Sequence, residues 1–339
     1  MEVKSFSEII GQDMVVGYLK KAISNNKTAT AYLFAGIKGI GKTSTALAFA
    51  LSLNCINPAN GNGCRSCQSC RKMIGGNHPD LSIIGLEDKK ESIVIEQIRN
   101  INREISFPPA LDGYRIIIID PAERMTVEAT NAFLKTLEEP PSNNIFILNV
   151  RDTGEILPTI ISRCQKVYFK PINEREIVNF LINNKDVEKE RAGIAARLSE
   201  GSIGQAERFV QDDFFSDRVN WIKMLYNVIN NSFESLFDIA QKFITKRDSK
   251  DNRINLMLGI WKSFYRDMLL IKHGGRIDFI INSDFKDQIE KASSVYTIDG
   301  LIKSISIIAG AEHDLKANLN TLFLIEKSLF RLKRALNSV

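Results

Sequence analysis

The first half of the chain alternates between short apolar runs and longer segments of helical periodicity. The apolar runs are AYLFAG (31–36), DLSIIGL (80–86), YRIIIID (114–120) and NIFILNV (144–150). Continuous apolar runs of this length are typical of buried parallel strands. The segments between them, STALAFALSLNC, IVIEQIRNINREISF and VEATNAFLKTLEEPP, have the period of helices, and prolines follow the last two. From Tyr32 to about Phe169 this alternation predicts a parallel sheet with helices on both faces.

The remaining segments are predicted to be helical. Residues 1–30 are expected to form a lead-in with Met14, Tyr18, Leu19 and Ile23 on one helical face. Beyond Pro171 the strand signals disappear. Trp261, Phe264, Tyr265, Met268 and Leu269 form one apolar helix face. The stretch 314–336 is predicted to be a single amphipathic helix of about six turns. Its apolar stripe consists of Leu315, Leu319, Leu322, Ile325, Leu329, Leu332 and Leu336.

These patterns predict an α/β plus all-α fold in three parts. They are a P-loop-type sheet domain (1–170), a small helical lid (171–208) and a C-terminal helical domain (209–339). The length of 339 residues agrees with two or three domains. Apolar residues make up 44% and charged residues 25%, as in soluble globular proteins. The net charge of +5 permits a nucleic-acid partner, and a solvated mixed surface explains it equally well.

Targeting signals are not evident in the sequence. The start, MEVKSFSEII, lacks the charged and apolar regions of a signal peptide. No apolar run approaches the ~20 residues of a membrane helix. A cytoplasmic location without a membrane partner is therefore expected.

The segment 36–43, GIKGIGKT, matches the phosphate-binding pattern G-x-x-x-x-G-K-[ST]. Gly36, Gly39 and Gly41 let backbone N–H groups turn toward phosphate oxygens. Lys42 can reach the β- and γ-phosphates, and the Thr43 hydroxyl can bind Mg²⁺. A chance glycine turn is the alternative, and the preceding strand and following helix argue against it. ATP with Mg²⁺ is the cofactor that such a loop can hold.

Asp120 ends the run IIIID, where P-loop ATPases place a carboxylate that holds Mg²⁺ through water. A glutamate that orients the attacking water often follows it. Here Pro121 follows, and it cannot act as a base. The first glutamate is Glu123, which we interpret as a carboxylate at a helix start. Little or no ATP hydrolysis by this chain itself is expected.

Four of the five cysteines lie within 16 positions of one another, at Cys55, Cys64, Cys67 and Cys70. In a cytosolic protein such a cluster indicates metal rather than disulfides. Four thiolates form the closed tetrahedral set of a structural zinc site within an insert at 55–70. Four free thiols are one alternative. An iron–sulfur cluster is another, although its usual spacings differ.

The motif Ser162-Arg163-Cys164 follows the strand NIFILNV. Arg163 has two interpretations. It can pair with a local acid, or it can project onto the γ-phosphate held by a neighbouring subunit and stabilise transition-state charge in trans. Spacing alone does not decide between them.

Taken together, FSEIIGQ, AYLFAGIKGIGKT, the cysteine insert, NAFLKTLEEPP and ILPTIISRC resemble the bacterial clamp-loader ATPases of the AAA+ class. The resemblance covers residues 1–210 and continues more weakly into the C-terminal helices, where NLNTLFLIEKSLFRL is similar to the family's oligomerisation collar. The zinc insert is typical of the bacterial branch. The resemblance implies a part in ATP-dependent loading of the sliding clamp onto primed DNA, within the DNA polymerase III assembly. No polymerase site is recognisable.

Three departures from the family's tau/gamma motor subunit resemble its delta-prime subunit. Pro121 replaces the motor's glutamate, Asn149-Val150-Arg151 replaces its threonine sensor, and Gly204 occupies the position of its lid arginine. The resemblance then implies that Arg163 acts in trans on a motor subunit and that Gln12 packs near the adenine. The implied partners are the motor and delta subunits, the sliding clamp indirectly, and primer-template DNA.

Two alternatives remain. Intact Lys42 and Thr43 favour a motor subunit that itself hydrolyses ATP. A zinc-ribbon adaptor with a decayed phosphate loop and no replication role is the other.

Overall fold

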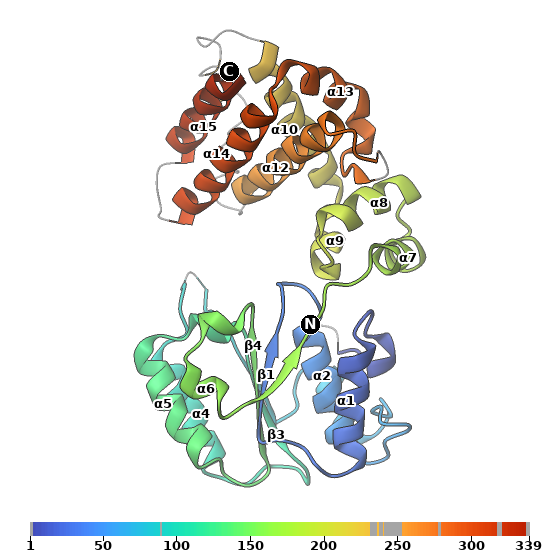
Figure 1. Cartoon of the computed structure of the whole chain (residues 1–339). Helices are drawn as coiled ribbons and strands as arrows, with labels where there is room; N and C mark the ends of the chain where they lie inside the picture. The colour runs from blue at the N-terminus through green and yellow to red at the C-terminus, as the bar shows by residue number, and fades with distance from the viewer. Residues whose placement is uncertain are drawn as a thin grey trace. The chain divides into compact units, whose positions relative to one another are not determined.

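The computed structural model describes residues 3–88, 90–230, Leu236, Ala240, 253–276, 279–316 and 321–336 (Figure 1). The chain forms two compact units. The first comprises residues 1–180 and 200–205, and the second comprises residues 181–199 and 206–339. The three-part division at 170 and 208 stays a prediction.

The first unit is built on a parallel sheet of five strands in the order β2-β3-β4-β1-β5. The strands are β1 (Ala31–Ala35), β2 (Leu81–Ile84), β3 (Arg115–Ile119), β4 (Asn144–Val150) and β5 (Gln165–Tyr168). The four apolar runs of the sequence therefore form strands as predicted. In β1, β3 and β4 every residue is buried, because these strands lie inside the sheet with helices on both faces.

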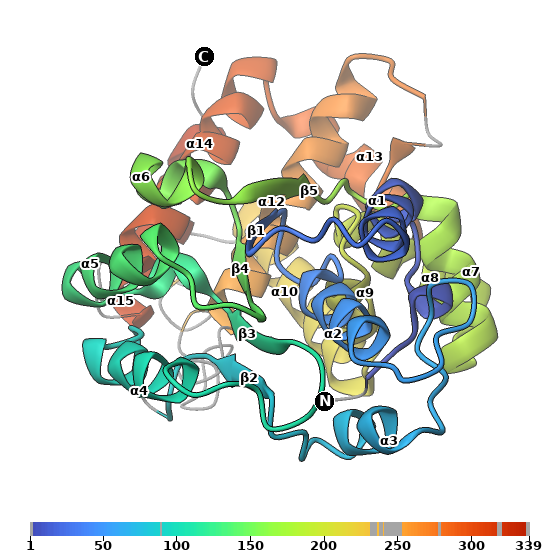
Figure 2. The ribbon, with the colours of Figure 1, turned by 90° about the horizontal axis from the view of Figure 1, so that it is seen from below.

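Helices cover both faces of this sheet (Figures 1 and 2). On one face lie α4 (Ile95–Ile105), α5 (Val127–Glu138) and α6 (Pro158–Ile161), whose apolar residues pack with those of β1, β3 and β4. On the other lie α1 (Asp13–Ser24) and α2 (Lys42–Leu53). The shorter elements are η1 (Phe6–Glu8), α3 (Gln68–Ile74), η2 (Ala122–Arg124) and η3 (Thr153–Glu155).

The predicted apolar face of the lead-in is wrong in part. The buried residues of α1 are Val15, Leu19 and Ala22. Met14 is 79% exposed and Tyr18 is 42% exposed. Val15, Leu19 and Ala22 stand at positions i, i+4 and i+7, which share one side of a helix. Met14 and Tyr18 lie on the neighbouring side, so the apolar pattern around Leu19 fitted two adjacent faces of the helix. The smaller side chains face the protein.

The described residues of the second unit form helices joined by turns, with no strand among them. It contains α8 (Lys189–Leu198), α10 (Asp212–Asn230), α12 (Arg253–Lys272), η5 (Ser283–Phe285), α13 (Lys286–Val295), α14 (Ile298–Lys316) and α15 (Thr321–Leu336). Two further helices, α7 (Glu174–Lys185) and α9 (Ile203–Phe209), have residues in both units. Trp261, Phe264, Tyr265 and Met268 of α12 are buried, as the apolar pattern predicts.

The prediction of a single helix over 314–336 is wrong. Asp314 belongs to α14 and Lys327 to α15, and their side chains form an ion pair 3.0 Å long. Two residues 13 positions apart on one straight helix would lie about 20 Å apart, so the stretch belongs to two helices packed side by side. Leu319 lies outside the described residues. None of the helices in the described part of the chain is long and apolar enough to cross a membrane.

Candidate functional site

The phosphate loop connects the end of β1 to the start of α2. Gly39 and Gly41 have φ angles of +77° and +105°, which favour glycine over residues with a side chain. Gly41 is the N-cap of α2, so the positive end of that helix faces the loop. The backbone N–H of Gly36 donates to the carbonyl of Val150, 3.2 Å away, which fixes the loop to the end of β4. The local geometry is that of an anion-binding loop.

Lys42 is turned toward the loop itself. Its Nζ donates to the carbonyl oxygens of Gly36 at 2.6 Å and Ile37 at 3.0 Å, and the residue is only 8% exposed. Burial lowers the pKa of Lys42, and the nearby carboxylates of Asp120 and Glu123 raise it. A phosphate would replace the two carbonyls as the partner of this ammonium group.

Three polar side chains meet at the carboxyl ends of β3 and β4. The Thr43 hydroxyl donates to the carboxylate of Asp120. The amide nitrogen of Asn149 donates to Asp120 at 3.0 Å and to Thr43 at 3.2 Å. Asn149 is fully buried, and its amide oxygen has no hydrogen-bond partner among the described residues. A hydroxyl, a carboxylate and an unsatisfied amide oxygen are the donors that Mg²⁺ prefers, so these residues fit the ion.

In the sequence, Asn149 is part of the segment that departs from the motor's threonine sensor, yet its side chain lies within this cluster. The one sequence feature that could have indicated this role is a polar residue near the end of an otherwise apolar strand. Glu123 lies in the first turn of η2, as expected for a carboxylate at a helix start. One of its carboxylate oxygens is shielded from solvent and has no hydrogen-bond partner in the described part of the chain.

The segment 200–205 is fastened to the outer side of the phosphate loop. The Ser202 hydroxyl donates to the carbonyl of Lys38 at 2.7 Å, and the backbone N–H of Gly204 donates to the carbonyl of Gly39 at 2.9 Å. A Cβ atom on Gly39 would lie 2.6 Å from the Ser202 hydroxyl oxygen. The absence of side chains at both glycines therefore permits the backbone contact.

Gln12 joins the N-terminal segment to the residues that follow β5. Its amide donates to the carbonyl of Lys170 at 2.7 Å and accepts from the Lys170 backbone N–H at 3.3 Å. The residue is buried. Its place near an adenine stays a prediction.

The four predicted cysteine ligands come together around α3. The sulfur atoms of Cys55, Cys64, Cys67 and Cys70 all lie within 4.8 Å of one another. The Cys64 and Cys70 sulfurs are 3.9 Å apart. A zinc tetrahedron with ~2.3 Å Zn–S bonds has sulfur–sulfur edges of ~3.8 Å. The set is therefore the right size for a closed site.

The chemistry of the sulfur atoms also suits a metal. Hydrogen bonds from Ser66 lower the pKa of Cys64 to about 5, and the Cys67 N–H donates to the same sulfur at 3.3 Å. Such donors favour the thiolate, which is the form that binds zinc. Burial raises the pKa of Cys70 in the absence of a cation. A divalent ion would compensate that desolvation.

His78 supports the cluster without belonging to it. Its Nδ1 accepts from the Asp80 backbone N–H at 3.1 Å, so its Nε2 carries the proton toward Ser69 Oγ, 3.0 Å away. Ser69 lies on α3 between two of the cysteines. On the other side Arg65 pairs with Glu8 at 2.6 Å. The cluster is thereby tied to both the start of β2 and the N-terminal segment.

Arg163 lies just beyond α6 at the surface of the first unit. Its guanidinium donates to the carbonyl of Thr159 at 3.0 Å and to the carboxylate of Glu138 at 2.7 Å. The side chain of Arg163 is 35% exposed and that of Glu138 is 52% exposed. The local-acid interpretation therefore holds for the isolated chain. The pair is nevertheless open to solvent on its outer side.

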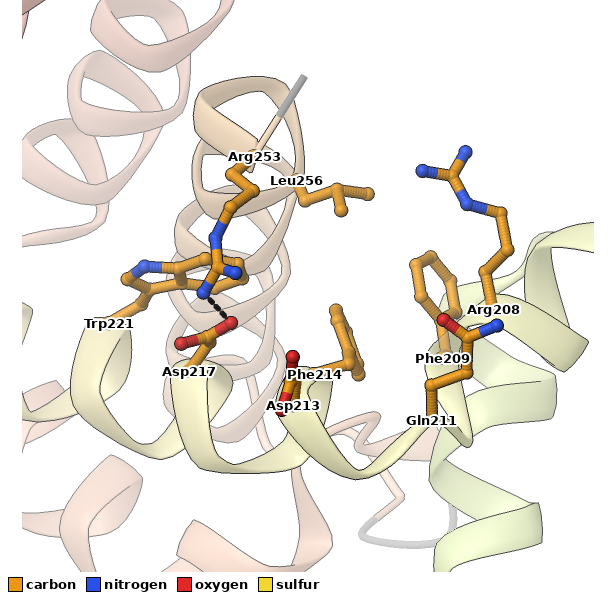
Figure 3. Close-up of a pocket in the computed structure, with 9 residues that line it drawn as sticks. All are labelled: Arg208, Phe209, Gln211, Asp213, Phe214, Asp217, Trp221, Arg253 and Leu256. Atoms are coloured by element: carbon orange, nitrogen blue, oxygen red, sulfur yellow. Dashed lines mark hydrogen bonds and ion pairs between the residues drawn. The ribbon is translucent and has the colours of Figure 1, made fainter. Parts of the chain in front are cut away.

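The second unit holds a cavity that sequence reasoning missed (Figure 3). Its volume is about 320 Å³. Phe209 and Phe214 stack with ring centroids 4.5 Å apart, and Trp221 lies beyond them. Arg253 pairs with Asp217 at the rim, and Arg208 stands on the other side. These residues come from α9, α10 and α12, which are far apart in the sequence, so no short sequence motif could predict the cavity.

The fold and the site define a P-loop α/β protein with a four-cysteine cluster and a helical C-terminal region. The family model of the DNA polymerase III delta subunit matches residues 11–173. The chain is 30% identical to DNA polymerase III subunit delta′ of Bacillus subtilis, over 95% of this chain and 96% of that protein. It is 36% identical to subunit tau of the same organism, over 58% of this chain and 34% of tau.

Among solved structures, a gamma subunit-related protein of DNA polymerase III from Thermotoga maritima superimposes with a TM-score of 0.50. That match covers 94% of this chain and 99% of the other at 20% identity, and it supports the fold. The chain belongs to the family of bacterial DNA polymerase III clamp-loader subunits, which includes delta′ and tau. The family resemblance drawn from the sequence motifs is thereby confirmed.

Proposed function

We propose that the chain is a delta′-type subunit, which supplies Arg163 to the ATP site of a neighbouring motor subunit. The observation that carries this proposal is the position of Arg163. It lies at the surface, held by one exposed ion pair with Glu138. Exposed pairs of this kind contribute only about 0–1 kcal/mol. Breaking the pair with Glu138 therefore costs little free energy, and the guanidinium can bind a γ-phosphate, which carries a larger negative charge.

The chain's own nucleotide site supports the same assignment. Pro121 follows Asp120 where a water-orienting glutamate would stand, and Gly204 brings no cation to the loop. The glutamate would orient the attacking water, and the lid cation would stabilise transition-state charge. The similarity to delta′ extends over nearly the whole of both chains.

In this proposal the partners are the tau/gamma motor subunits and the delta subunit, with the C-terminal helices as the oligomerisation collar. Loading places the sliding clamp on primed DNA. The four cysteines hold one structural zinc ion, whose closed set leaves no position for catalysis. When bound, Mg²⁺-ATP would be held by Lys42, Thr43, Asp120 and Asn149, and Mg²⁺ would supply charge neutralisation there.

The test is Arg163→Ala in a loader reconstituted with motor and delta subunits. Assembly, followed by native mass spectrometry, should be unchanged. DNA-stimulated ATP hydrolysis should fall, because one motor site loses its cation in trans. Full hydrolysis by the variant loader would refute the proposal.

A motor subunit that hydrolyses ATP itself is the second candidate. The connected Thr43, Asp120 and Asn149 side chains favour it, since this part of the site is complete. Steady-state turnover of the isolated protein separates the two candidates. Turnover that Lys42→Ala abolishes would establish the motor assignment, and its absence supports the delta′ assignment.

A further inference from the structure

The cavity of the second unit has no part in the phosphate loop, in the cysteine cluster or in the proposed role of Arg163 (Figure 3). Its volume of about 320 Å³ lies at the lower end of the range of small-molecule sites, ~300–1,000 Å³. Its walls come from α9, α10 and α12, and every lining residue belongs to the same compact unit. A space of this size admits one small ring system with a short substituent.

A row of three aromatic side chains lies at the base of the cavity. Phe209 and Phe214 stack with ring centroids 4.5 Å apart, and Trp221 meets Phe214 edge-on at 6.2 Å. None of the three residues is more than 6% exposed. The indole N–H of Trp261 donates to the backbone carbonyl of Trp221 at 3.1 Å, which anchors one end of the row. The aromatic base is therefore formed before a ligand arrives.

The turn between α9 and α10 places a cation beside this aromatic row. The backbone N–H of Gln211 donates to the carbonyl of Arg208 at 3.4 Å, and that of Phe214 donates to the carbonyl of Gln211 at 3.0 Å. These bonds fix the backbone of Arg208 relative to the Phe214 ring. In Figure 3, Arg208 and Phe209 stand on one side of the cavity, and Leu256 of α12 stands on the other.

The charges around the cavity narrow the class of ligand. Two arginines, Arg208 and Arg253, face two aspartates, Asp213 and Asp217, so the lining has no net charge. A nucleic-acid strand needs a positively charged groove and is therefore disfavoured. Arg253 is already paired with Asp217. Arg208 is exposed, and its guanidinium has no hydrogen bond or ion pair among the residues that the structure describes. One guanidinium matches one carboxylate through two parallel hydrogen bonds.

We propose that this cavity binds a small planar aromatic carboxylate, with its ring between Phe214 and Leu256 and its carboxylate on Arg208. The ring gains apolar contact and an aromatic neighbour, for which offset or edge-on geometry is favourable. The carboxylate gains the one cation of the lining that has no acid beside it. The inference goes beyond the proposed function and does not rest on it, because no residue of the first unit takes part.

The experiment titrates the full, zinc-loaded chain with 2-naphthoate and with 2-naphthamide, which share one ring system and differ in charge. The wild-type chain should bind 2-naphthoate more tightly. Arg208→Ala should raise the Kd for 2-naphthoate about 10-fold or more, the range of a charge-assisted hydrogen bond. The Kd for 2-naphthamide should change less than about twofold on the same scale. Arg208→Lys should be intermediate. Arg175→Ala removes an exposed arginine of α7 as the matched control and should change neither value.

Leu256→Trp should fill the cavity and abolish binding of both compounds, which identifies the site. Arg208→Ala changes an exposed side chain, so the charge comparison does not depend on whether the fold accepts a larger residue at position 256. Equal affinity of the wild-type chain for the two compounds, or binding that neither variant weakens, would overturn the inference. A wild-type chain that binds neither compound would overturn it as well, while leaving the trans role of Arg163 to the reconstituted loader.

Discussion

Arg163 and Glu138 are joined by an ion pair of 2.7 Å at the surface of the first unit, although 25 positions separate them in the chain. Glu138 belongs to α5 and Arg163 follows α6, so the packing of these two helices brings the pair together. The pair holds the guanidinium in a defined place before any partner arrives. Its exposure keeps the arginine exchangeable.

Replacing Glu138 with Gln should release Arg163 without loss of the fold. The free energy of unfolding should change by less than about 1 kcal/mol, because the pair is solvent-exposed. ATP turnover of the reconstituted loader should be retained or rise. Glu139→Gln, an exposed neighbour, is the control for both measurements. A variant Glu138→Gln that behaves like Arg163→Ala would mean that the ion pair itself, rather than the free guanidinium, is required.

The four-cysteine cluster should hold one zinc ion per chain. Thiol titration of the native protein should find the four ligands protected, and a strong chelator should expose all four and lower the melting temperature. Cys164 should stay unreactive after chelation, because burial raises its pKa to about 12. Cys70→Ser should lose the metal, and Cys164→Ser should keep it. Rapid reaction of four thiols without a chelator, or bound iron, would contradict the assignment.

Asp80 and Arg115 should be the most costly ion pair to break in the sheet domain. Asp80 accepts from Arg115 at 3.4 Å and from the backbone N–H groups of Ala110 and Leu111 at 2.7 and 2.9 Å. Asp80→Ala should reduce the free energy of unfolding by about 3–5 kcal/mol, since it leaves a buried guanidinium unpaired. Denaturant unfolding measures this, with exposed Asp112→Ala as the control. A loss below about 1 kcal/mol would show the pair to be hydrated.

Asp267 should make the second unit less stable as pH rises. Burial raises its pKa above the ordinary value of 3.8, and hydrogen bonds from Asn282 and Ile281 oppose the shift only in part. Between the ordinary pKa of 3.8 and the raised pKa of the folded state, the folded protein keeps a proton that the unfolded chain has lost. The free energy of unfolding therefore decreases with increasing pH. Asp267→Asn should gain stability relative to wild type across that window. Parallel stability curves for the two proteins would contradict the assignment.

The strands and the phosphate loop were predictable because their signals are local. Buried parallel strands require continuous apolar runs, and the glycines of the loop lie within eight positions. β5 was harder to recognise, since three of its four residues are exposed at the edge of the sheet. The division between α14 and α15 was missed because the apolar spacing runs from Leu315 to Leu336 without a break.

The sequence predicted the residues of the candidate site only where they are neighbours in the chain, as in the phosphate loop. Asn149 meets Thr43 and Asp120 because β4 lies between β1 and β3, which is a property of strand order rather than of any motif. Whether Arg163 pairs locally could not be decided from spacing, since its partner depends on how α5 and α6 pack. The same holds for the aromatic cavity of the second unit, which three helices form together.

Arg163 of this chain, and not its own phosphate loop, should be needed for ATP hydrolysis at the neighbouring subunit. The most direct measurement compares single-turnover ATP hydrolysis by loaders that carry Lys42→Ala or Arg163→Ala in this subunit alone. Loaders with Lys42→Ala should hydrolyse ATP at a near wild-type rate. Loaders with Arg163→Ala should lose the contribution of one site, where a trans arginine is worth about 10³-fold or more. A large loss with Lys42→Ala and none with Arg163→Ala would refute the trans role of Arg163.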